Sequence, residues 1–197
     1  GMTQGEVKKY CKKVLKQYGY NPILENGFLF AEGKTPIGLV AHMDTVFKTA
    51  PKLIIGEDYI TANNGLGADD RAGVFSILYL VRNGYRPHIL LMEDEEIGCV
   101  GAEKFAKSGI SMDVKYLIEL GRQGSEDCVF YDCANDDFEE YVESFGFKMN
   151  YGSFSDISVI APHLGVSAVN LSIGYYNQHT KNEILMMIST FTESLIC

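Results

Sequence analysis

The feature that most constrains the fold is an apolar run that ends in four consecutive acids. Residues 87–92 have the length and the side chains of a buried strand, and they are followed by Glu93, Asp94, Glu95 and Glu96. Such an ending can place one carboxylate on a metal ion while its neighbour accepts a proton from water. Taken alone, the run is explained more simply as a solvated acidic turn. The choice depends on whether other strand-like runs also end in ligand-type residues.

Composition limits the classes of protein to which this chain can belong. With 197 residues, 46% of them hydrophobic and 12% aromatic, the sequence predicts one globular domain spanning residues 1–197. A formal net charge of −9 argues against a nucleic-acid surface. No apolar run approaches the length of a membrane span, and the start of the sequence has no signal-peptide core. The five cysteines are scattered without zinc-finger or redox spacing, so we expect a cytoplasmic location.

Strand-like and helix-like runs alternate along the chain. Helical spacing predicts helices over residues 3–18, 69–81, 100–107, 136–145, 155–163 and 184–195. Strands are expected in a hairpin around residues 26–30, at 37–41, in a hairpin over 52–62, at 87–92, at 115–119 with 128–131 as its neighbour, and at 166–176. This alternation predicts an α/β fold, a three-layer αβα sandwich with helices on both faces of a mixed central sheet.

A histidine ends one of the predicted buried strands. His42 follows residues 37–41, and Asp44 lies two residues later, so both side chains project to the same side if the strand continues. Asp44 would then hold the ring nitrogen that is not on a metal and fix the tautomer. A hydrogen-bonded core histidine is the alternative explanation of His42, and the nearby aspartate weakens it.

Three further ligand-type positions follow the same logic. Asp69 and Asp70 come after a glycine-containing loop at residues 65–67, where a carboxylate can bridge two cations, although an ordinary helix-capping pair explains them equally well. Glu119 and His179 end apolar strands, and each alone is unremarkable. Because sites in open α/β sheets form beyond the carboxyl ends of the strands, the set predicts one shared site.

The ordered motifs closely resemble those of the dizinc exopeptidase clan, to which peptidase T, leucyl and glutamyl aminopeptidases and related deacylases belong. The resemblance spans residues 41–183. It is carried by Ala-His-Met-Asp-Thr-Val at 41–46, Gly-Ala-Asp-Asp-Arg-Ala-Gly at 67–73, Asp-Glu-Glu-Ile-Gly at 94–98, Ile-Glu-Leu at 118–120 and Gln-His-Thr-Lys-Asn-Glu at 178–183. Each motif alone is unspecific, whereas the ordered set of five is highly specific.

The resemblance implies a role for each site residue. One metal would be held by His42, the bridging Asp69 and Glu119, and the other by Asp69, Glu96 and His179. Glu95 would be the general base, and Asp44 would orient His42. The implied cofactors are two Zn²⁺ ions, with Co²⁺ or Mn²⁺ as alternatives, and the implied partner is a small peptide substrate.

The chain also departs from the family pattern. Many members have Asp where this chain has Glu119, although Glu is also used. Larger members insert a lid or dimerisation domain between the fourth and fifth ligands, and residues 120–178 are too few for one. A catalytic domain without a lid favours an aminopeptidase.

The sequence leaves other functions open. The chain could be an N-acyl amino acid deacylase of the same clan, or a metal-binding pseudoenzyme or partner-binding module. Glu93 and Asp94 are either solvated or attract a peptide amino terminus. Tyr175, Tyr176 and the pair at 155–156 could line the substrate cleft, although a tyrosine in an apolar strand more often packs in the core. The sequence does not determine the oligomeric state.

Overall fold

The computed structural model describes residues 2–187 and contains five helices and two sheets. The helices are α1 (Gln4–Gln17), α2 (Ala68–Arg82), α3 (Val100–Lys107), α4 (Asp136–Glu143) and α5 (Asp156–Leu164). The strands are β1 (Ile23–Glu25), β2 (Phe28–Ala31), β3 (Thr35–His42), β4 (Leu53–Ile55), β5 (Tyr59–Ala62), β6 (Pro87–Met92), β7 (Tyr116–Arg122), β8 (Asp127–Val129), β9 (Lys148–Met149), β10 (Ser167–Ser172), β11 (Tyr175–Tyr176) and β12 (Ile184–Met186).

The main sheet is mixed and has eight strands in the order β1-β2-β6-β3-β7-β10-β8-β9. Its centre is parallel, because β3 pairs with β6 and with β7, and β7 pairs with β10, all in the parallel sense. Antiparallel pairing of β2 with β6 and of β8 with β10 extends the sheet on both sides. A second, four-stranded sheet has the order β11-β12-β5-β4. The carboxyl ends of β3, β6 and β7 therefore meet at one edge.

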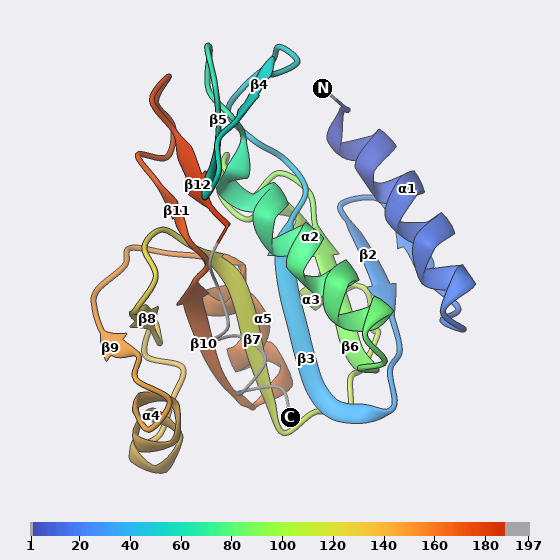
Figure 1. The fold of residues 1–197 in the computed structure, drawn as a ribbon. Coiled ribbons are helices and arrows are strands. Elements are labelled where there is room, and N and C mark those ends of the chain that lie inside the picture. Colours follow the sequence, from blue (N-terminus) through green and yellow to red (C-terminus); the bar gives the residue numbers. More distant parts are fainter. Residues whose placement is uncertain (1, 188–197) are drawn as a thin grey trace.

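Helices cover both faces of the main sheet (Figure 1). On one face α1 and α2 contribute Cys11, Leu15 and Ile77 to a cluster of buried side chains, and on the other α3 and α5 contribute Phe105 and Ile160 to a second cluster. Strand β3 supplies both clusters in alternation, as the pleat requires. The predicted α/β fold with helices on both faces of a mixed sheet is confirmed.

Helix α2 packs closely against β7. A Cβ atom at Gly73 would collide with the backbone carbonyl oxygen of Leu120, so only glycine permits this approach. The approach brings the start of α2 to the edge at which β3 and β7 end. This contact therefore positions the first turn of α2, which carries Asp69.

Three predictions of elements need correction. Residues 128–131 were expected beside the strand at 115–119, but β10 lies between β7 and β8. The physical reason is burial. Five of the six residues of β10 are buried, which suits an interior strand, whereas the three-residue β8 lies toward the edge of the sheet.

The predicted strand over 166–176 and the predicted helix over 184–195 are also partly wrong. The former is divided into β10 and β11, which belong to different sheets, and Gly174 between them has a φ of 90°. Residues 184–186 form β12, paired with β5 and β11, because a short apolar run does not distinguish helix from strand. Residues 188–195 lie outside the described part of the chain.

None of the helices within residues 2–187 combines the length and the apolarity needed to cross a membrane.

Candidate metal centre

His42 lies at the carboxyl end of β3 and is almost completely buried, with 3% of its surface exposed. Its Nδ1 atom is 3.3 Å from Oδ1 of Asp44, and its Nε2 atom is 3.2 Å from Oδ1 of Asp69. Burial acts to lower the pKa of His42, but interactions with Asp44 and Asp69 outweigh it and raise the pKa well above its usual value. Asp44 thus holds one ring nitrogen of His42, and the other ring nitrogen faces Asp69 and Glu95.

Asp69 joins two histidines that are far apart in the sequence. Its Oδ1 atom faces His42, while its Oδ2 atom is 3.1 Å from Nε2 of His179 in the loop between β11 and β12. Burial acts to raise the pKa of Asp69, but hydrogen bonds with His179 and His42 lower it to about 2. A carboxylate that is ionised and contacts a different imidazole with each oxygen suits a position between two cations.

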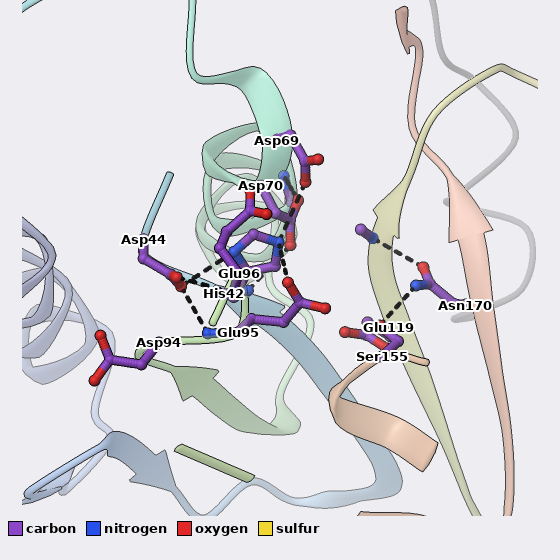
Figure 2. Close-up of polar contacts among 12 residues, drawn as sticks. His42, Asp44, Asp69, Asp70, Asp94, Glu95, Glu96, Glu119, Ser155 and Asn170 are labelled. Carbon is purple, nitrogen blue, oxygen red and sulfur yellow. Dashed lines mark hydrogen bonds and ion pairs between the residues drawn. The ribbon is translucent and has the colours of Figure 1, made fainter. Parts of the chain in front are cut away.

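Glu95 and Glu96, the last two acids of the run after β6, are held by their backbone amides. Asp44 accepts hydrogen bonds from the amide nitrogens of Glu95 and Glu96 at 3.2 and 3.1 Å. Oε1 of Glu96 is 2.9 Å from Nε2 of His179, and Oε2 of Glu95 is 3.8 Å from Nε2 of His42. Asp44 therefore fixes both the histidine of β3 and the turn after β6 (Figure 2).

Ligand atoms of His42, Asp69 and Glu96 all lie within 4.8 Å of one another, so a single divalent ion can contact all three. Glu95 has a different electrostatic environment. Burial, supplemented by the negative charge of Glu119, raises its pKa to about 7 although His42 opposes the shift. A carboxyl group with this pKa can both accept and release a proton near neutrality.

Glu119 lies apart from that group of three residues (Figure 2). It is completely buried in β7, and its Oε2 atom accepts a hydrogen bond from the amide of Ile157, in the first turn of α5, at 3.4 Å. Its Oε1 atom has no hydrogen-bond partner among residues 2–187. A buried carboxylate oxygen without a partner costs several kcal/mol unless a cation or proton meets it. This orphaned oxygen, together with the histidine and carboxylate donors, fits a divalent metal.

Two acids of the site were not assigned a role from the sequence. Glu183 is buried and accepts hydrogen bonds from the amides of Leu66, Gly67 and Asp69 at 3.0, 2.6 and 3.1 Å, so it shapes the loop that carries Asp69. Asp70 is also buried and accepts a hydrogen bond from the amide of His42 at 3.1 Å. Both lie in the motifs quoted above, but their partners are backbone amides, which leave no mark in a sequence.

Other side chains that were considered for the site have structural contacts. Glu93 is buried and pairs with Lys8, so it is neither solvated nor free to attract a substrate. Tyr175 is buried, and its hydroxyl group donates a hydrogen bond to the carbonyl oxygen of Gly121 at 2.8 Å. Tyr175 packs in the core.

The fold is similar to those of several solved peptidase structures. Aminopeptidase PepT from Bacillus cereus matches with a TM-score of 0.74 and 16% identity over 99% of this chain and 92% of its own. A tripeptidase from Staphylococcus aureus subsp. aureus Mu50 matches with a TM-score of 0.74 and 14% identity over 99% and 90%. An aminopeptidase from the archaeon Desulfurococcus kamchatkensis matches with a TM-score of 0.70 and 13% identity over 93% and 85%.

Comparison with protein-family models gives no match, and comparison with curated protein sequences gives none either. At 13–16% identity, the structural matches establish a shared fold. The three solved structures named above are peptidases, which is the class that the five motifs resemble, and a glutaminyl cyclase from Porphyromonas gingivalis shares the fold as well, with a TM-score of 0.59 and 14% identity over 86% of this chain and 74% of its own. This chain therefore shares the three-layer α/β fold of these solved structures.

Proposed function

We propose that this protein is a dizinc metallo-exopeptidase, an aminopeptidase that hydrolyses the first peptide bond of short peptides. The observation that carries the proposal is the position of Asp69, whose two oxygens face His42 and His179 while Glu96 contacts the second histidine. The shared fold supports the proposal, because proteins with that fold include aminopeptidases and a tripeptidase. The catalytic domain would act without a lid domain.

His42, Asp69 and Glu119 would hold one ion, and Asp69, Glu96 and His179 the other. When bound, zinc supplies Lewis acidity toward water and toward the scissile carbonyl group. Asp44 orients the His42 ring, and burial of the site strengthens every electrostatic interaction within it.

Glu95 would move the proton. It accepts a proton from the attacking water as the new carbon–oxygen bond forms, and it delivers that proton to the amine as the carbon–nitrogen bond breaks. Burial raises the pKa of Glu95, which favours its holding the proton between the two steps. The products are a free amino acid and a peptide that is one residue shorter.

The test combines metal analysis with a substrate panel. The purified protein is loaded with zinc, its zinc content is measured, and it is incubated with dipeptides, aminoacyl-anilides and N-acyl amino acids. We expect two ions per chain and release of amino-terminal residues. Hydrolysis of N-acyl amino acids alone would establish a deacylase instead. Two bound ions without hydrolysis of any substrate would indicate a metal-binding protein that is not an enzyme.

A further inference from the structure

Asp156 is the most unusual buried charge that the resemblance leaves without a role. It is the first residue of α5, it is completely buried, and within residues 2–187 its carboxylate oxygens have no hydrogen-bond partner apart from the thiol of Cys99, which is a weak donor. Burying a carboxylate without a partner costs several kcal/mol, so such groups normally contact a cation or a hydrogen-bond donor. No ion pair to Asp156 forms within the same residues.

The backbone holds Asp156 beside Glu119, because the amide of the next residue, Ile157, donates a hydrogen bond to Oε2 of Glu119 at 3.4 Å. The strongest electrostatic neighbours of this aspartate are Glu119, His42 and Glu95, in that order, and burial together with the charge of Glu119 raises its pKa well above the usual range. Two of these three neighbours are acids, and His42 already faces Asp44 and Asp69. Positive charge is therefore lacking on this side of the site.

Glu119 also has a buried carboxylate oxygen that no cation or hydrogen-bond donor contacts among residues 2–187. The residue is completely buried, and this oxygen is its Oε1 atom. Its other oxygen is held by the first turn of α5, the same turn that carries Asp156. Three buried carboxylate oxygens on β7 and α5 thus lack a cation or a strong hydrogen-bond donor in the described structure, and carboxylate oxygens are ligands for divalent metal ions.

We propose that Asp156 is a metal ligand and that, together with Glu119, it forms the carboxylate side of the second cation site. The inference rests on the proposed dizinc function and adds to it a ligand that the five motifs do not contain. It also explains the separation of Glu119 from the group formed by His42, Asp69 and Glu96. In this arrangement Glu96 and His179 would hold one ion with Asp69, and Glu119 and Asp156 would complete the site of the other ion, which His42 and Asp69 would also hold.

The first test is zinc binding by the Asp156→Asn variant. Asn keeps the shape of the side chain but removes the charge, so we expect one ion per chain in place of two, or affinity for the second ion reduced by more than about 100-fold, beyond the usual effect of outer-sphere changes. Asp136→Asn is the matched control, because Asp136 is also the first residue of a short helix, α4, but is exposed. The control should bind two ions.

Thermal stability separates a ligand from a residue with only a structural role. Without metal, Asp156→Asn replaces a buried acid that faces other acids by a neutral amide of the same shape, so its Tm should equal or exceed that of the wild type, while its gain in Tm on zinc addition should be smaller. A purely structural Asp156 predicts a lower Tm with and without zinc. That result, or two ions bound with wild-type affinity, overturns the inference and leaves the peptidase proposal intact.

A second variant, Asp156→Cys, tests the inference if Asp156→Asn does not fold. In Asp156→Cys loaded with cobalt, a thiolate ligand would add a near-ultraviolet charge-transfer band that cobalt-loaded wild type, with its native Cys99 nearby, lacks. Absence of that band from folded, cobalt-loaded protein contradicts the inference. If wild-type protein binds no divalent ion, both this inference and the proposed function fail. If it binds one ion, this inference fails alone, and the hydrolysis panel still tests the peptidase.

Discussion

The two halves of the acidic run after β6 differ in what their side chains contact. Glu93 pairs with Lys8 of α1 and accepts a hydrogen bond from the amide of Gly27 at 3.0 Å. Asp94 accepts a hydrogen bond from Nε2 of Gln4 at 2.7 Å, and its side chain points away from His42 (Figure 2). The first half of the run thus attaches α1 and the β1–β2 hairpin to the sheet.

The second half faces the opposite way. Glu95 and Glu96 have their amides on Asp44 and their carboxylates toward the two histidines. Asp94 has a φ of 61°, in the left-handed region, and this reversal of the chain separates the two pairs of acids. Glu93 and Asp94 therefore stabilise the fold, whereas the adjacent and chemically similar Glu95 and Glu96 belong to the candidate site. The following substitutions test that division.

The largest effect is expected from Glu95→Gln. The amide keeps the shape of the side chain but cannot accept a proton from water, so turnover of a dipeptide should fall by roughly 10²–10⁴-fold. Zinc content should not change. Full activity in this variant, or loss of zinc from it, would show that Glu95 is not the base.

Glu96→Gln should act on metal binding. Because a neutral amide is a poor replacement for a carboxylate on zinc, affinity for one of the two ions should fall by more than the roughly 10–100-fold that outer-sphere partners contribute. Zinc titration by calorimetry measures it, with Asp94→Asn as the control for removal of a neighbouring charge. Equal zinc affinities in both variants would contradict the division of the run.

Asp44→Asn should produce a smaller loss. Asp44 contacts Nδ1 of His42 and the amides of Glu95 and Glu96, so the substitution loosens both sides of the site without removing a ligand. We expect metal affinity or activity to fall by roughly 10–100-fold in a folded protein. Wild-type affinity and activity together would remove Asp44 from the site.

Glu93→Gln should change stability and leave the site alone. It weakens the buried contacts with Lys8 and Gly27, which should lower the free energy of unfolding by about 1.5–3 kcal/mol, as for hydrogen bonds to charged groups. Denaturant unfolding measures this loss, and zinc stoichiometry should stay at the wild-type value. A variant that is fully stable but deficient in zinc would reverse the assignment.

Much of the fold followed from periodicity. The predicted helix over 100–107 coincides with α3, and those over 3–18 and 136–145 differ from α1 and α4 by one or two residues at their ends. These segments have a clear apolar stripe or a capping residue, such as Thr3, whose side chain accepts a hydrogen bond from the amide of Glu6. Short segments were less predictable, because three apolar residues at 184–186 fit either a helix or a strand.

The residues of the candidate site also include some that the sequence indicated and some that it did not. Strand-end placement indicated His42 and His179, and the resemblance to the exopeptidase clan singled out Asp69 and Glu96; in the structure Asp69 contacts both histidines, and Glu96 contacts His179. Asp156 was considered only as a cleft residue, because its distinguishing property is burial without a cation or a strong hydrogen-bond donor. Burial depends on what α3 and α5 pack against, and a single sequence does not record it.

By itself the sequence determined which residues stand at the ends of buried strands, since hydrophobic periodicity is local and a ligand-type residue after an apolar run is visible in one dimension. Only the tertiary structure decided which acids of the 93–96 run face the histidines, because one left-handed residue at Asp94 sets that direction. It also decided that Glu119 and Asp156 share a buried space, since β7 and α5 meet through sheet order and helix packing. Side chains distant in the chain acquire a common electrostatic environment only when packing excludes water between them.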